Sequence, residues 1–351
     1  MRRGRWLTAA LALLLLAFSP TVAFYLGPLL GGSPRLAPTL PPAPVGVATA
    51  EGVRAYAQSA PEFARVLADL RVGERRRLSL AGEHYRTYLQ ARRTLGPAKA
   101  SALMALLAAE VRNQDPALGR RSVYGSPEAA LRGAGGWLAF LTYAQNVRPG
   151  DRSLARLSPV PLVPEVVRFY APPIRRAANA LHLAPGTLAA ILDNEQSGGR
   201  SGLGLAGWLR DFTDTMALRV TEAYGGSGIT GRLSQTVGLT QMGWEDAVRQ
   251  EERLRSLGIR LRGPYPHDEA QARAALARPG DHFLLSGSRL RGYVEAALGP
   301  DPANLTDARA YFVGPAWHNN PALASSGQTW PYAWNAFFKA CLYERRLFAG
   351  E

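Results

Sequence analysis

The sequence predicts a mainly α-helical protein. Apolar residues recur at intervals of three and four along most of the chain after residue 50, as on the buried face of a helix. Strand signals are scarce, and the one candidate is a small hairpin over residues 224–233, where Gly-Gly-Ser-Gly would form the turn. The chain is 47% hydrophobic and only 19% charged, which excludes a disordered composition. Its 351 residues can bury one large core or two smaller ones.

The first 30 residues predict export. Arg2, Arg3 and Arg5 precede an apolar run over residues 6–18, and the small residues at 21–23 resemble a cleavage site. This is the layout of a secretory signal peptide. Apolar character continues to the end of the segment, so an uncleaved membrane anchor is the alternative. Either interpretation places the rest of the chain outside the cytoplasm, in the periplasm or cell envelope.

Two further regions precede the second half of the chain. Residues 31–50 are rich in proline and predict an extended spacer, and residues 51–150 predict a helical region of unknown role. Within the latter, Gly96-Pro97 separates two helices. The prolines of residues 147–164 mark a boundary, so a second domain is expected over residues 160–351. The apolar positions at helical spacing in the first region are Phe63, Val66, Leu67, Leu70, Tyr85, Tyr88, Leu89, Leu103, Leu106 and Leu107.

Helices are also expected through the second domain. Asp281 is a suitable N-cap for residues 282–298, and Thr306 for a short helix that Gly314-Pro315 would end. A final amphipathic helix is expected over residues 332–348. The remaining expected helices cover residues 164–181, 188–194 and 244–257, the last ending at Gly258.

The net charge and the cysteine and histidine content bear on which partners and cofactors the protein can have. The net charge of +14 predicts attraction to polyanions, which include nucleic acid, anionic lipid and acidic wall polymers. No nucleic-acid-binding motif is present, and the export signal argues against such a partner. Cys341 is alone, and the five histidines form neither an HExxH pair nor a cluster with it. No metal and no cofactor are therefore expected.

Glu195 is the candidate catalytic residue. Leu188, Ile191 and Leu192 precede it by seven, four and three residues, which places the carboxyl on an apolar helix face. Gly198-Gly199 ends the helix just beyond, where the helix dipole is negative. Burial and this dipole both favour the neutral carboxyl, so we expect a raised pKa and an acid that can donate a proton. The alternative is a structural, ion-paired glutamate.

Two further segments carry candidate binding residues. Ser234 to Met242 is a turn of small residues that presents Gln241, whose amide can both donate to and accept from an acetamido sugar. Asp307 to Trp317 places Tyr311 before a Gly-Pro turn, where its hydroxyl would reach a groove or its ring would join the core.

Together these segments resemble the catalytic domain of soluble lytic transglycosylases and goose-type lysozymes. The matching motifs are Glu195-Gln-Ser197, Gly238-Leu-Thr-Gln241 and Ala310-Tyr-Phe-Val-Gly-Pro315, and the resemblance covers roughly residues 164–315. It implies a lysozyme-like α domain that cuts peptidoglycan between N-acetylmuramic acid and N-acetylglucosamine. Glu195 would be the catalytic acid, and Gln241, Tyr311, Ser197 and Met242 would bind the substrate.

The chain departs from the family pattern in four places, of which the replacement of a methionine by Thr240 is the mildest. Gln196 displaces the serine that follows the glutamate, Phe312 replaces an asparagine, and the segment between Glu195 and Gly238 is longer. A transglycosylase needs only one glutamate and forms a 1,6-anhydro product, whereas a hydrolase commonly needs a second acid. Asp211 and Asp214 in the long segment are the candidates for that acid. A non-catalytic envelope protein that binds peptidoglycan or partner proteins is the alternative of a different class.

Overall fold

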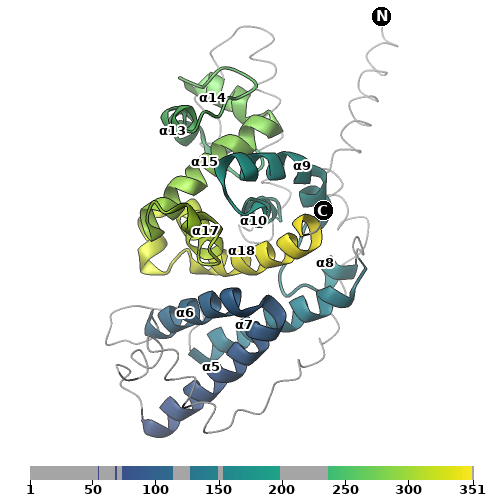
Figure 1. Cartoon of the computed structure of the whole chain (residues 1–351), viewed down its shortest axis with the longest axis vertical. Coiled ribbons are helices and arrows are strands. Elements are labelled where there is room, and N and C mark those ends of the chain that lie inside the picture. The colour runs from purple at the N-terminus through teal and green to yellow at the C-terminus, as the bar shows by residue number, and fades with distance from the viewer. Residues whose placement is uncertain are drawn as a thin grey trace, which may run out of the picture. The chain divides into compact units, whose positions relative to one another are not determined.

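The computed structural model describes residues 73–113, 127–148, 153–197 and 236–349, together with the single positions 54 and 68. The N-terminal segment, the spacer, the hairpin predicted over residues 224–233, and both Asp211 and Asp214 lie outside this part of the chain. The prediction of a mainly α-helical protein is confirmed (Figure 1). The longer helices are α5 (Glu74–Leu95), α6 (Pro97–Asn113), α7 (Pro127–Asn146), α9 (Pro164–Leu181), α10 (Pro185–Gln196), α15 (Pro279–Leu298), α17 (Ala310–Asn319) and α18 (Trp330–Tyr343).

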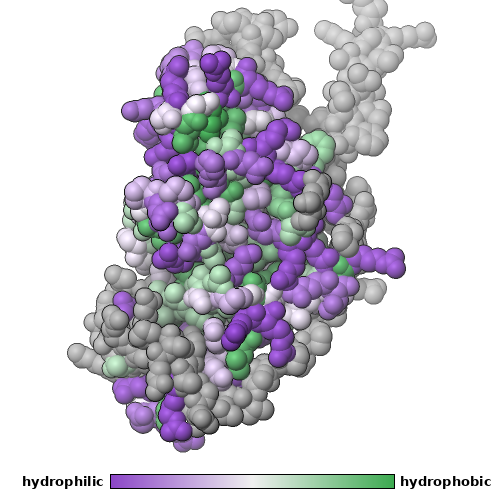
Figure 2. All heavy atoms as spheres, viewed as in Figure 1, coloured by the Kyte–Doolittle hydropathy of each residue, from purple (hydrophilic) through white to green (hydrophobic). Residues whose placement is uncertain are grey.

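Shorter elements connect these helices. The only strands in the described residues are β1 (Thr236–Val237) and β2 (Met242–Gly243). The short helices are α8 (Ser153–Leu157), α12 (Trp244–Val248), α13 (Glu251–Ser256), α14 (Glu269–Leu276) and α16 (Pro302–Thr306), with a 3-10 turn at Pro321–Ser326 and a π turn at Glu344–Phe348. Figure 2 shows hydrophilic and apolar residues interspersed on the face in view.

The chain divides into two compact units. Among the described residues, the first unit holds 161–181, 191–197 and 236–289, and the second holds 73–113, 127–148, 153–160, 182–190 and 290–349. One division falls after Val160, inside the predicted boundary at residues 147–164. The others fall within or beside helices of the expected second domain, so the second unit combines its last helices with α5, α6 and α7.

The helices α5, α6 and α7 pack against one another in the second unit. As expected, Gly96-Pro97 separates α5 from α6: Gly96 has a φ of 85° and donates its N–H to the Arg92 carbonyl, and Pro97 starts the next helix. The buried face of α5 differs from the expected stripe, because Tyr85, Tyr88 and Leu89 are only half-buried. The residues that α5 buries are Leu80, His84, Thr87, Ala91 and Thr94.

The last long helix, α18, is buried on all sides. Every residue from Tyr332 to Tyr343 is buried, so the expectation of an amphipathic helix was wrong. The α-helix ends at Tyr343, and a π-helix continues it to Phe348, the predicted end. It packs against α7 and α17, with the Trp137 and Phe338 rings stacked at 5.2 Å. A helix that is apolar around its whole circumference belongs in the centre of a core.

Two capping predictions were wrong. Helix α15 begins at Pro279, and Asp281 lies inside its first turn, where its buried carboxylate accepts from Arg262 N at 2.7 Å and pairs with Arg278. Helix α16 ends at Thr306 instead of beginning there. Gly314-Pro315 does not end a helix but lies inside α17. A Cβ on Gly314 would come within 2.6 Å of the Leu290 side chain, so glycine at this position allows close helix packing.

The helix predicted over residues 244–257 is divided into α12 and α13, with Arg249 and Gln250 between them. Gly258 follows with a φ of 67°, as its predicted role as a helix stop requires.

The amino-terminal end of α10 is fixed within the second unit. Gly186 N donates to the Glu344 carboxylate at 2.6 Å, and a Cβ on Gly186 would lie 2.6 Å from the Ala340 carbonyl oxygen. A carboxylate suits this position because the first amides of a helix have no partner within the helix.

We predict that Gly186→Ala lowers the free energy of unfolding by about 1–3 kcal/mol, because the added methyl would overlap a backbone oxygen. Gly82→Ala is the matched control, since no atom lies within 4 Å of that added methyl. It should stabilise α5 by up to about 1 kcal/mol. Denaturant unfolding measures the free energy of unfolding of both variants. Equal effects of the two substitutions would contradict the close packing of Gly186 against the Ala340 carbonyl oxygen.

Candidate functional site

Glu195 lies where the buried helix α10 reaches the surface. Every residue from Gly186 to Asn194 is buried, whereas Glu195 is half-buried. The apolar residues Leu188, Ile191 and Leu192 are buried as expected, but so are the residues on the other faces of the helix. The position of Glu195 at the helix end, and not an apolar stripe, therefore sets its environment.

Two hydrogen bonds hold the last turn of α10 within the first unit. The buried Asp193 carboxylate accepts from Val163 N at 3.0 Å, immediately before α9 begins. Gln196 Nε2 donates to the Leu239 carbonyl at 2.9 Å. Because Glu195 lies between these two anchored residues, its backbone is fixed next to residues 238–241.

Residues 238–241 form the turn of a short antiparallel hairpin. Thr236 pairs with Gly243 and Val237 with Met242. The turn requires positive φ at Gly238, 80°, and at Gln241, 50°. This hairpin was not predicted, and its strands have two residues each, too few for an alternating pattern to be visible in the sequence.

His282 of α15 holds the turn in place. Its Nδ1 lies 2.9 Å from the Leu276 carbonyl, which can only accept, so Nδ1 carries the proton. Its Nε2 then accepts from Thr240 N at 3.0 Å and from the Thr240 hydroxyl at 2.8 Å. Burial lowers the pKa of His282 to about 4, although the hydrogen bond to Leu276 opposes the shift. A Cβ on Gly238 would lie 2.8 Å from the ring, so the imidazole also requires glycine there.

The amide of Gln241 bonds within its own turn. Its Oε1 accepts from the Thr236 hydroxyl at 3.0 Å, and its Nε2 donates to the Gly238 carbonyl at 2.9 Å. One N–H and one lone pair of this amide are thus committed to the hairpin. Met242 is fully buried, and the Ser197 hydroxyl donates to the Asn194 carbonyl at 3.1 Å. Of the predicted site residues, Glu195, Ser197, Gln241 and Met242 lie in the first unit.

Tyr311 lies in the second unit, in the first turn of α17. It is 5% exposed, and the Lys99 ammonium lies 5.5 Å from the centre of its ring. Burial raises the pKa of its hydroxyl, and the negative charge of Glu344 adds to this shift. The neighbouring Phe312 is also buried, with its ring edge-on to Trp330 and Trp334. The residue in place of the family's asparagine is therefore part of an aromatic core.

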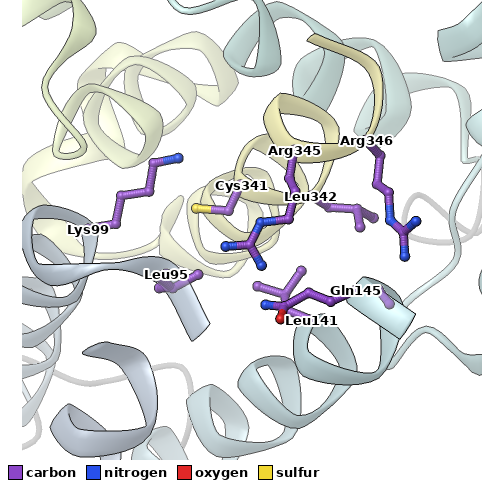
Figure 3. A pocket seen from close by; sticks show the side chains of 9 residues that line it. Leu95, Lys99, Leu141, Gln145, Cys341, Leu342, Arg345 and Arg346 are labelled. Atoms are coloured by element: carbon purple, nitrogen blue, oxygen red, sulfur yellow. The ribbon is translucent and has the colours of Figure 1, made fainter. Parts of the chain in front are cut away.

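A small pocket of the second unit contains none of the predicted site residues (Figure 3). Burial raises the pKa of the Cys341 thiol to about 12, so it stays protonated and is a poor nucleophile. The pocket is lined by Leu95, Lys99, Leu141, Ala144, Gln145, Cys341, Leu342, Arg345 and Arg346.

No group of three or more His, Cys, Asp or Glu side chains is arranged to hold a metal ion within the described ranges. No helix in the same ranges has the length and apolar character needed to cross a membrane. No family model, curated protein or solved structure matches the chain.

Sequence reasoning missed His282 and Gln196 as the residues that fix the site. Gln196 was visible only as a departure from the family pattern. A buried histidine in a helix gives no sequence signal, because the Thr240 and Leu276 groups that it contacts lie elsewhere in the chain.

We predict that acid weakens the fold through His282 and His84. Burial lowers the pKa of His84 to about 3, opposed by its contact with the Met104 carbonyl. From pH 6.5 down to about 4 the unfolded chain protonates both residues and the folded protein neither, so stability is present above pH 6.5 and falls below it. The loss is up to about 1.4 kcal/mol per pH unit for each histidine.

Urea unfolding at pH 7 and pH 5 measures this effect. His282→Gln and His84→Gln remove one titrating group each, so each variant should lose less stability between the two pH values than the parent does. An unchanged pH dependence in both variants would contradict the neutral, buried state of these rings.

Proposed function

We propose that this protein is a peptidoglycan glycosidase with a lysozyme-like α domain and that Glu195 is its catalytic acid. The observation that supports it most is the placement of Glu195. It is the half-buried carboxyl at the end of an otherwise buried helix, and its neighbours on both sides are hydrogen-bonded. Glycoside cleavage needs a carboxyl that is held in one geometry and still reaches substrate.

The proposed reaction is that of a lytic transglycosylase. Glu195 protonates the bridging oxygen between N-acetylmuramic acid and N-acetylglucosamine, and the bond from this oxygen to the muramyl C1 breaks. The resulting carboxylate then takes the proton of the muramyl C6 hydroxyl as that oxygen attacks C1, which gives a 1,6-anhydro ring and restores the acid. No water enters, and one carboxyl serves both steps.

The alternative proposal is a non-catalytic peptidoglycan-binding protein of the envelope. Two observations favour it: Gln241 uses part of its amide within its own turn, and Met242 and Tyr311 are buried. In this proposal Gln241, Met242 and Tyr311 have structural roles and do not bind the substrate. Both proposals place the chain outside the cytoplasm, with the N-terminal segment as signal or anchor.

We expect Glu195→Gln to reduce peptidoglycan lysis by at least about a hundredfold, the scale of general acid catalysis. The substitution keeps the size of the side chain and removes its titrating proton. Glu245→Gln, at an exposed position of α12 in the same unit, is the control and should leave lysis unchanged. Lysis by Glu195→Gln at the parent rate would sink the catalytic assignment.

Mass spectrometry of the digest identifies the reaction. The fragments should end in 1,6-anhydromuramic acid, which is lighter by one water than a reducing end. Asp211→Asn and Asp214→Asn should each retain substantial activity, because the proposed reaction gives neither carboxylate a step. Reducing ends together with an inactive Asp211 or Asp214 variant would identify a hydrolase. Binding to sacculi without any product would support the non-catalytic proposal.

A further inference from the structure

One face of α9 is exposed and combines an aromatic ring with positive charge. Figure 1 shows α9 as a single continuous helix. Its opposite face is buried in the first unit through Val166, Val167, Ile174, Ala177, Ala178 and Leu181. The exposed positions, which we call the α9 face, are Glu165, Arg168, Phe169, Pro172, Arg176, Asn179 and Ala180. At 100° per residue these side chains share one stripe about 120° wide.

The exposed ring of Phe169, which we call the platform, is held in position by the Tyr170 ring beside it. It is 61% exposed, and among the described residues only Leu78 is a comparably exposed large hydrophobic side chain. The ring meets Tyr170 edge-on at 4.9 Å, and Tyr170 in turn lies 6.1 Å from the buried Phe283. These contacts connect the exposed ring to the core, so a ligand that stacks on it finds it already oriented.

Two consecutive prolines remove two backbone donors of the helix beside this platform. Pro172 and Pro173 lie inside α9 and carry no N–H. In a regular helix these positions would donate to the carbonyls of Arg168 and Phe169. The backbone at Pro172 and Pro173 therefore donates no hydrogen bond to the Arg168 and Phe169 carbonyls. Hydroxyl groups of a ligand can supply such donors.

Arg168 and Arg176 give the α9 face its charge. Both are exposed, and they are separated by about 12 Å along the helix. Glu165 is the one acidic residue of the face, so its net charge is positive. Arginine pairs with carboxylates through two parallel hydrogen bonds, which suits an acidic ligand.

We propose that the α9 face binds a glycan strand that carries carboxylates, namely peptidoglycan with its stem peptides. The apolar C–H face of a sugar stacks on Phe169, sugar hydroxyls donate to the Arg168 and Phe169 carbonyls, and Arg168 and Arg176 pair with carboxylates of the peptides. This inference rests on the proposed function and adds a binding site outside the residues assigned to bond cleavage.

An anionic membrane is the competing occupant. One phenylalanine buries far less apolar surface than a single myristoyl chain, which by itself gives only marginal membrane binding. Membrane binding also does not require an aromatic ring whose orientation is fixed in advance. The combination of one aromatic ring, two carbonyls that lack their usual helix donors and spaced arginines therefore favours the glycan.

Sedimentation with purified peptidoglycan tests the site, with the full-length Glu195→Gln variant as parent so that the sacculi stay intact. We expect Phe169→Ala and the double variant Arg168→Ala/Arg176→Ala each to weaken binding about tenfold. Pro172→Ala with Pro173→Ala restores both helix donors and should weaken binding about fivefold without loss of helix. The matched controls on α5 are Leu78→Ala, which has the same exposed fraction as Phe169, and Arg75→Ala/Arg92→Ala.

The outcomes separate the two proposals. Lysis by the Glu195→Gln variant would sink the catalytic assignment, and the same variants would then be compared by their binding to a soluble disaccharide peptide, which contains no MurNAc–GlcNAc bond to cut. Binding that is absent in the parent, or equal in the α9 and α5 variants, would overturn the α9 site. Binding to phosphatidylglycerol vesicles or to a single-stranded oligonucleotide that Phe169→Ala abolishes, without an effect on peptidoglycan, would assign the face to that other ligand and also overturn it.

Discussion

The burial of α10 is the constraint on which the account depends. A helix buried over most of its length must satisfy most of its polar groups with partners from the protein. At the first end, the Glu344 carboxylate accepts from Gly186 N. At the other end, the side chains of Asp193 and Gln196 bond to backbone groups of Val163 and Leu239. Glu195, which lies between Asp193 and Gln196, is half-buried at the end of this helix.

The turn beside Glu195 likewise uses polar groups to hold its own structure. A neutral His282 holds Thr240, Gly238 leaves room for the ring, and Gln241 bonds within its own hairpin. Polar groups used in this way define one backbone geometry, because a buried donor or acceptor without a partner is costly. Among the described residues, few groups near Glu195 are then left to recognise a substrate. In the function that we propose, the exposed arginines and phenylalanine of α9, in the same unit, supply this recognition.

The helical class and the break at Gly96-Pro97 followed from the sequence because they depend on local spacing and backbone chemistry. The orientation of elements did not. Tyr85, Tyr88 and Leu89 follow helical spacing, yet α5 buries His84 and Thr87, whose burial depends on residues such as Met104 from another helix. Gly314-Pro315 has the composition of a helix end but lies within α17, where the absence of a Cβ at Gly314 leaves room for the Leu290 side chain. The candidate site had the same limit: Glu195 was proposed from its motif, while the roles of His282 and Gln196 depend on long-range contacts.

The structure of a glycan complex tests the central claim most directly. We would determine it for the Glu195→Gln variant with a peptidoglycan tetrasaccharide, which the variant should bind without cleavage. The account predicts a glycosidic oxygen between a muramyl and a glucosaminyl ring within about 3 Å of the side chain at position 195. A tetrasaccharide bound with no bridging oxygen near this side chain would contradict it.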